Sequence, residues 1–126
     1  TRCLKVFGRY QTKQGIENSR VTFHIGQGVA GIAYKNATVV NKVLPKYNDQ
    51  NAAEYLRICQ EELKLPEKKV AKLNEKASAF HCIPIRHFGK AQVVGVISVD
   101  SVEPTEFEAA DLRKIETIVN QYTAIF

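Results

Sequence analysis

Three glycines in the stretch IGQGVAG, namely Gly26, Gly28 and Gly31, have the G-x-G-x-x-G spacing that can cradle the pyrophosphate of a dinucleotide. That chemistry needs a strand before the glycines, a crossover helix after them and an acidic residue about 20 positions further on. The segment VTFHI supplies the strand, but only about two helical turns fit before Asn36, and the next acid, Asp49, falls in a loop. The sequence therefore predicts a turn between a strand and a short helix, and no dinucleotide site.

The cysteines are the next candidates for chemistry. Cys3, Cys59 and Cys82 are odd in number and form no C-x-x-C pair, so neither a disulfide framework nor a zinc site is predicted, and no metal site is expected. A reducing cytoplasm fits this usage best. Core packing is the favoured interpretation of Cys59, and a small buried residue that of Cys82. Haem ligation by one of the 3 histidines is a less favoured alternative to an ordinary polar position on a strand.

Length and composition indicate one globular domain. The chain has 126 residues, of which 44% are apolar and 25% charged. It contains no apolar run of the roughly 18 to 20 residues that span a bilayer, and no signal peptide. The net charge of +5 comes from dispersed lysines, and the densest stretch, residues 64–76, also contains Glu67 and Glu75. Its lysines have helical spacing, which favours a solvated helix face over a nucleic-acid patch.

The pattern of apolar residues and breakers predicts an α+β domain with a largely antiparallel sheet. In the first part of the chain we expect a hairpin of strands 2–10 and 20–25, a short helix 29–34, a strand 37–41 and a loop 42–51. Two helices follow, the first with Tyr55 and Cys59 on its apolar face and the second beginning at Pro66. Strands 78–86 and 91–101 then form an antiparallel hairpin, and a long helix follows Thr105 and Glu108. Thr105 and Glu108 have the spacing of a capping box.

The final helix carries an apolar stripe that must be buried against a partner. Its apolar residues repeat at intervals of three and four, and Ile118 and Ile125 widen the stripe. The sheet is the favoured partner, while a helical bundle at a dimer seam and a signalling helix that leads to another domain are alternatives. Because the chain starts within an apolar alternation and stops on Phe126, we expect it to be a piece of a longer protein.

Two long segments resemble a GAF domain. The first half of the family's domain, with a glycine turn, a short helix, a strand and a loop that contains a tyrosine, is similar to the segment FHIGQGVAGIAYKNATVVNKVLPKY. The second half of that domain is similar to the segment SAFHCIPIRHFGKAQVVGVISVDSVEPTEFEAADLRKIETIVNQYTAIF. The resemblance covers roughly residues 20 to 126. It implies a single GAF domain over 1–126, with about six antiparallel strands, helices on both faces, a ligand cavity between the sheet and the helices and loops of the 30s to 70s, and a first helix upstream of Thr1.

The family's known chemistries make different demands on the residues present. Asp100 and Ser101 replace the Asn-Lys pair of cyclic-nucleotide-binding members, and Leu112 replaces a glutamate, which argues against that ligand. The order His81-Cys82 is the reverse of the Cys-His pair of bilin-binding members. Free methionine sulfoxide reduction needs a thiolate with a second thiol in reach, and the Gly-Ala-Cys of those members has no counterpart near the glycines. The chain is therefore predicted not to be an enzyme.

The resemblance predicts a regulatory or sensory domain that binds a small organic ligand and signals through its terminal helices to another domain. We expect it in the cytoplasm, with the soluble part of a membrane-anchored protein as an alternative setting. The expected partners are a second copy in a homodimer or an effector domain in the same chain, and not nucleic acid. A ligand-free dimerisation or docking module is the first alternative, and a cysteine-dependent free methionine sulfoxide reductase the second. The sequence specifies no cofactor.

The expected cavity has an apolar wall and a polar rim, although half-buried tyrosines and a turn or N-cap aspartate are the ordinary interpretations of three rim residues. Arg57 and Arg86 are the only arginines near the rim, so a strongly anionic ligand lacks an obvious bidentate clamp. The residues expected to bind the ligand are Phe23, Ile32, Val40, Asn41, Tyr47, Asp49, Tyr55, His81 and Ile83.

Overall fold

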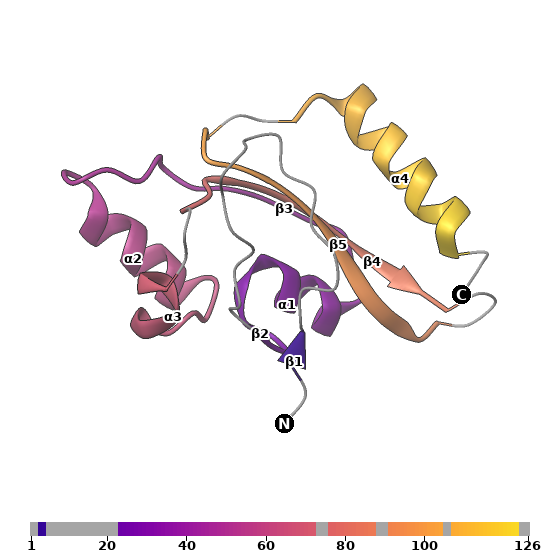
Figure 1. Ribbon diagram of the computed structural model, residues 1–126, viewed down its shortest axis with the longest axis horizontal. Coiled ribbons are helices and arrows are strands. Elements are labelled where there is room, and N and C mark those ends of the chain that lie inside the picture. Colours follow the sequence, from indigo (N-terminus) through magenta and orange to yellow (C-terminus); the bar gives the residue numbers. More distant parts are fainter. Residues whose placement is uncertain (1–2, 5–22, 73–75, 88–90, 105–106, 124–126) are drawn as a thin grey trace.

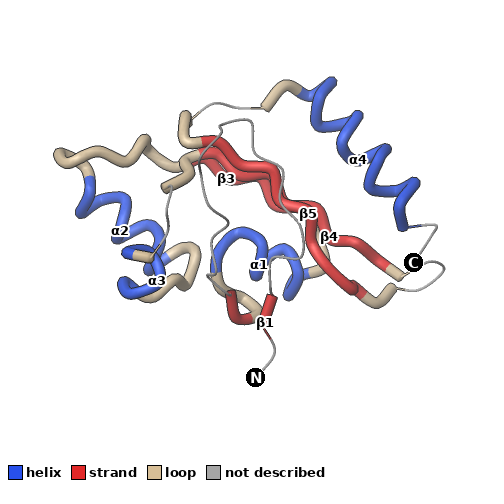
Figure 2. The backbone as a smooth tube through the Cα atoms, in the orientation of Figure 1, coloured by secondary structure: helices blue, strands red, loops and turns tan. Residues whose placement is uncertain are grey.

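The computed structural model describes residues 3–4, 23–72, 76–87, 91–104 and 107–123. Short strands and helices alternate along the first half of the chain, and two longer strands and a helix make up the second half (Figure 2). The elements are β1 (Cys3–Leu4), β2 (Phe23–His24), α1 (Gly28–Asn36), β3 (Val40–Val43), α2 (Ala52–Glu61), α3 (Glu67–Ala71), β4 (Ala79–Arg86), β5 (Val93–Ser101) and α4 (Ala109–Thr123).

The central sheet is antiparallel with the order β3-β4-β5. Residues directly opposite each other on neighbouring strands share a face of the sheet, so the register forms rows across all three strands. Two of these rows are Lys42–Phe80–Asp100 and Asn41–His81–Val99. Strands β1 and β2 pair with each other, also antiparallel. Because side chains alternate along β4, neighbouring rows face opposite sides.

Helices cover both faces of this sheet. α1, α2 and α3 lie on one side and α4 on the other (Figure 1). The main core fills the first side, where Val29 and Ala33 of α1 meet Tyr55 and Cys59 of α2 and Cys82 of β4. On the second side Val119 is the buried apolar residue of α4. We name these sides the α1 face and the α4 face.

The structure confirms the α+β class and the antiparallel pairing of β4 and β5. The third strand lies later than predicted, at Val40–Val43, because Ala37 takes a left-handed conformation that ends α1 and its N–H bonds back to Tyr34. The chain can turn into the sheet only after this cap. The described strands do not confirm a six-stranded sheet. Most of the predicted hairpin 2–10 and 20–25, and the capping residue Thr105, lie outside the described residues.

The glycine turn between β2 and α1 is closed by its own backbone. The N–H of Gly26 donates to the carbonyl of Gly31 at 3.0 Å, and that of Gly28 donates to Leu63 at 2.7 Å. Gly26 and Gly28 have φ angles of 91° and 69°, which glycine adopts without strain. The amides of Gly26 and Gly28 are therefore occupied within the protein, and the segment is a turn between a strand and a short helix.

No helix among the described residues has the length and hydropathy to cross a membrane.

Gly31 is the tightest point of this turn, and replacing it should destabilise the fold. A Cβ there would lie 2.8 Å from the carbonyl oxygen of His24 and 3.3 Å from the amide nitrogen of Gly26, both of them backbone atoms. We expect Gly31→Ala to lower the free energy of unfolding by about 1–3 kcal/mol, measured by urea denaturation. Gly95→Ala is the matched control, since its Cβ would make only an ordinary contact of 3.8 Å with Ile85. Equal losses in the two variants would contradict this account.

Candidate functional site

The two faces of the sheet separate the predicted ligand-binding residues into two groups. Val40 lies opposite Cys82 and packs against the core on the α1 face. Asn41 lies opposite His81, whose Nε2 is 3.8 Å from a carboxylate oxygen of Glu116 on α4. Ile83 follows His81 by two residues and has the same orientation. The residues Asn41, His81 and Ile83 therefore lie on the α4 face, where they cannot line one cavity with Val40.

The remaining predicted residues lie on the α1 face or in the loop before α2. Ile32 is half-buried against the core, whereas Tyr55 is a fully buried member of it. Tyr47 is 37% exposed. Asp49 is an exposed turn residue, and it is Asn48 whose side chain accepts the N–H groups of Gln50 and Asn51.

Phe23 lies in β2, and His81 differs from its predicted exposure. Only the backbone of Phe23 is described, in β2. His81 was expected at a polar rim or strand surface, but it is 3% exposed. The reason is that α4 covers this part of β4, which the alternation of the strand alone does not reveal.

The row Lys42–Phe80–Asp100 is the best candidate for a binding surface on the α1 face, and we name it the Phe80 row. Phe80 is half-buried and packs against the core, and the register places a cation on one side of it and a carboxylate on the other. Asp100 is exposed, as is Ser98 in the adjacent row. An apolar ring flanked by charged groups can hold a ligand that has both an apolar and a polar part.

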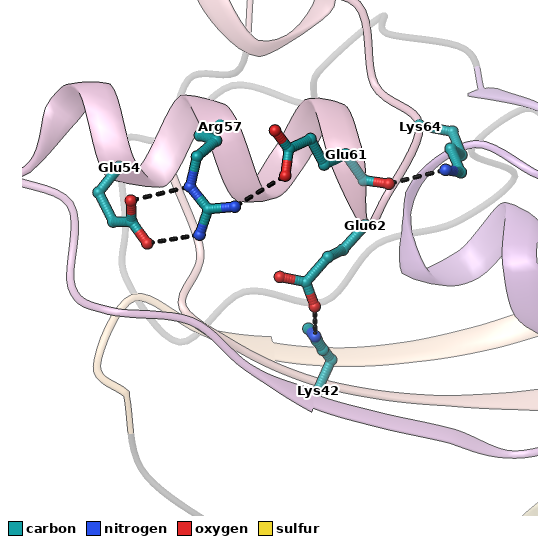
Figure 3. A network of polar contacts seen from close by, with 6 residues as sticks. All are labelled: Lys42, Glu54, Arg57, Glu61, Glu62 and Lys64. Carbon is teal, nitrogen blue, oxygen red and sulfur yellow. Dashed lines mark hydrogen bonds and ion pairs between the residues drawn. The ribbon is translucent and has the colours of Figure 1, made fainter.

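A salt bridge ties the Phe80 row to α2. Figure 3 shows Lys42 reaching from β3 to Glu62, with which it forms an ion pair. The Lys42 side chain is 31% exposed and that of Glu62 46%, so the pair lies at the surface. Exposed pairs contribute only about 0–1 kcal/mol to stability. A polar ligand can therefore compete for either group at small cost.

Two tyrosines lie at the core cluster against which Phe80 packs. The rings of Tyr47 and Tyr55 meet edge to face with centroids 5.3 Å apart, and the Lys76 ammonium lies 5.0 Å from the centroid of Tyr47. The Tyr55 hydroxyl donates to the carbonyl of Ala77 at 2.6 Å. Burial, followed by the charges of Cys59, Asp100 and Tyr47, raises the pKa of Tyr55. Tyr55 is thus a neutral, buried side chain fixed by its hydrogen bond, whereas the Tyr47 ring is accessible to solvent.

The arginines named from the sequence are both engaged in internal contacts. Arg57 donates to Glu54 and Glu61 on its own helix, as Figure 3 shows. The hydrogen bonds to these carboxylates raise the pKa of Arg57, and that of Glu54 is lowered mainly by the same bond. Arg86 donates to the carbonyls of Ala37 and Ala91. Neither guanidinium is placed to clamp an anion at the Phe80 row.

Two cysteines are buried thiols in the core. Cys59 is 2% exposed and Cys82 is fully buried, and the two belong to one apolar cluster. Burial raises the pKa of Cys59, and it raises that of Cys82 to about 11, although the hydrogen bond with Ser98 acts in the opposite direction. Since the thiolate is the nucleophile, neither sulfur is reactive while the core stays closed. Within the described part of the chain, no three metal-binding side chains lie close together.

Sequence reasoning missed Lys42 and Phe80 as site residues. The predicted strand ended at Asn41, which placed Lys42 in a loop. Period-two alternation was sufficient to group Phe80 with Cys82 and to separate both from His81, but it could not show which group faces α1.

Comparison with solved structures identifies the architecture. The GAF domain of an Acinetobacter phosphoenolpyruvate-protein phosphotransferase matches 83% of the chain at 18% identity, with a TM-score of 0.50. A structure described as "the GAF domain" matches 86% at 14% identity, with a TM-score of 0.58. The type II free methionine-R-sulfoxide reductase of Thermoplasma acidophilum matches 87% at 18% identity, with a TM-score of 0.57.

These matches show a GAF-like fold. The chain covers 50%, 50% and 63% of the length of the three proteins. No protein-family model and no curated protein matches the sequence. The similar structures include free methionine sulfoxide reductases, which are enzymes, and this contradicts the prediction that the chain is not an enzyme. The absence of a Gly-Ala-Cys motif was too narrow a basis for that prediction, because the fold itself is shared with a reductase.

The buried thiol of Cys82 should make stability depend on alkaline pH. Its pKa is about 11 in the folded chain, against an ordinary value of 9.0, so the unfolded state loses the proton first as the pH rises. The native state is thus favoured fully below pH 9.0, and this contribution, at most about 3 kcal/mol, is lost between pH 9.0 and about 11.

Cys82→Ala tests this dependence. The variant should be less stable than the parent at pH 7, because a buried group is removed, and the difference should shrink by about 2 kcal/mol by pH 11. Urea denaturation at each pH measures both values. A difference that stays constant from pH 7 to 11 would show that this thiol does not titrate as described.

Proposed function

We propose that this GAF-like domain is a regulatory module that binds a small organic ligand on the α1 face, over the Phe80 row. The observation that carries the proposal is the position of the half-buried Phe80 ring between Lys42 and Asp100. Ile32 and Val40 pack against the same core cluster as Phe80, and Tyr47 contacts Tyr55 of that cluster. The ligand would stack on the Phe80 ring and direct a polar group toward Asp100 or Ser98.

The charges around this surface favour a neutral or zwitterionic ligand over a strongly anionic one. Lys42 is paired with Glu62, and Lys46 with Glu103. Each cation is therefore partly neutralised by a carboxylate, and the nearby arginines are committed to other groups. A polyanion would be repelled by the Asp100 carboxylate, and neither Arg57 nor Arg86 is placed to bind it in a bidentate manner.

β4 offers a route by which occupancy can reach α4. Phe80 and His81 are neighbours on this strand, yet Phe80 faces the ligand surface and His81 faces α4. A ligand that displaces the backbone at Phe80 also displaces His81, because the two residues are adjacent on the strand. We propose that α4 passes this shift on, either to a second copy in a homodimer or to an effector domain in the same polypeptide. The proposed setting is the cytoplasm, without nucleic acid.

Ligand binding can be tested on the purified 126-residue chain. Native mass spectrometry detects a compound that co-purifies, and thermal shifts with nucleotides and amino acids identify ligand classes. We expect Asp100→Asn to weaken binding of a responsive compound about 10-fold or more, because a charge-assisted hydrogen bond is removed. Phe80→Leu should weaken it several-fold, because it removes the aromatic contact and keeps most of the apolar volume.

Asn41→Ala is the matched control for these variants. Asn41 is exposed, like Asp100, but it lies on the α4 face, so its removal should leave the affinity unchanged. Equal weakening in all three variants would place the ligand elsewhere. If no compound co-purifies and none shifts the melting temperature, the alternative of a ligand-free dimerisation or docking module is favoured instead.

Reduction of free methionine sulfoxide is the second candidate function. The similarity to the Thermoplasma acidophilum reductase, together with two cysteines in one cluster, favours it. The raised pKa values of both thiols mean that such chemistry would require the core to open around Cys82.

An activity assay decides this second candidate. The 126-residue chain is incubated with free methionine-R-sulfoxide and a dithiol reductant, and the methionine formed is measured. If the candidate is correct, turnover is present and Cys82→Ser lowers it at least 100-fold, whereas Asn41→Ala, at an exposed position on the opposite face of the sheet, changes it little. Absence of turnover in the parent chain would eliminate the candidate, and turnover that survives both Cys82→Ser and Cys59→Ser would assign the chemistry to other residues.

A further inference from the structure

The contact between α4 and the sheet is narrow. α4 lies against β4 on the face opposite to the main core (Figure 1). Val119 is 2% exposed, but the adjacent Ile118 is 50% exposed, and Leu112 and Ile115 are only partly buried. Beside the contact, Val43 on β3 is 42% exposed on the same face. Among the side chains that the structure describes, little apolar area therefore holds this helix, compared with the cluster around α1 and α2.

A polar group without a hydrogen bond lies beneath α4. His81 is 3% exposed, and neither of its ring nitrogens has a hydrogen-bond partner among the described residues. The nearest carboxylate oxygen, on Glu116 of α4, is 3.8 Å from Nε2, beyond hydrogen-bond distance. This buried imidazole has lost its hydrogen bonds to water, and no described protein group forms a hydrogen bond in their place.

Among the described neighbours of His81, no second charge replaces this hydration. Its cross-strand neighbours are Asn41 on β3 and Val99 on β5. The charged residues next to them, Lys42 and Asp100, belong to the row that faces α1. From α4, Glu116 is the one carboxylate within ion-pair distance among the described residues, and its side chain is 38% exposed to water. The cost of burying the imidazole is therefore relieved mainly when α4 moves away.

We infer that α4 is a detachable helix, poised to leave the sheet as a unit, and that His81 sets its docking equilibrium. When α4 is docked, His81 is shielded from solvent, and its ring nitrogens have no hydrogen-bond partner in the part of the chain that the structure describes. When α4 lifts from β4, water reaches both ring nitrogens, and their hydration offsets part of the free energy needed to expose Val119. This property lies in the fold itself and does not depend on whether a ligand binds over the Phe80 row.

Native-state hydrogen exchange of the 126-residue chain tests the inference directly. In the parent chain, the α4 amides should exchange at least 10-fold faster than the central amides of β4, through an opening that leaves β4 protected. His81→Leu replaces the imidazole with an apolar side chain of similar volume and removes its need for water. We expect this variant to slow exchange in α4 about 10-fold, while β4 changes much less. A structural role for His81 would instead make α4 exchange faster.

Two further variants separate this effect from general repacking. Ile83→Leu, on the same strand and face, conserves volume and apolarity and should leave α4 exchange within about twofold. Glu116→Gln should do the same, because the contact with His81 is too long to be a strong tie. If Glu116→Gln accelerates α4 exchange more than 10-fold, the pair holds the helix and the inference is overturned. It is equally overturned if His81→Leu leaves α4 unchanged, speeds it, or slows α4 and β4 together.

Discussion

The alternation of side chains along β4 is the constraint on which the rest of this structure depends. Consecutive residues of a strand must point to opposite faces, so Phe80 and Cys82 face the main core while His81 and Ile83 face α4. The strand is central in its sheet, and its hydrogen bonds to both neighbours fix this assignment. A displacement of the β4 backbone therefore moves side chains on both faces together. The proposed ligand surface over the Phe80 row and the helix α4 contact opposite faces of this one strand.

The two faces differ in how firmly their helices are held. On the α1 face the glycine turn locks α1 against β2 and the segment at Leu63, and a continuous apolar cluster joins α1, α2 and β4. On the α4 face, as far as the structure describes it, α4 lies over a strand whose buried surface includes an imidazole without a hydrogen bond. The same sheet thus has a rigid side, suited to shaping a site, and a weakly held side, suited to movement. The contrast follows from side-chain chemistry rather than from topology.

The amino-acid sequence was sufficient to predict most of the fold but only part of the candidate site. Apolar spacing, the predicted loop 42–51, Pro66 and the short link between the last two strands placed the helices and the β4–β5 pair, because these signals are local. The position of β3 depended on Ala37, a residue with no preference for the left-handed conformation that it adopts. A sequence rule that reserves this conformation for glycine could not detect it.

The candidate site was harder to predict because it depends on cross-strand register. Lys42 and Asp100 are far apart in the sequence and become neighbours of Phe80 only through two pairings. Histidine on an alternating strand suggested an accessible polar group, yet His81 is buried because α4, far along the chain, covers it. Burial of a polar side chain is thus decided by a tertiary contact. Where that contact supplies no hydrogen bond in return, the unfavourable desolvation weakens the docking of the element that caused it, so the helix that hides His81 is the helix that His81 loosens.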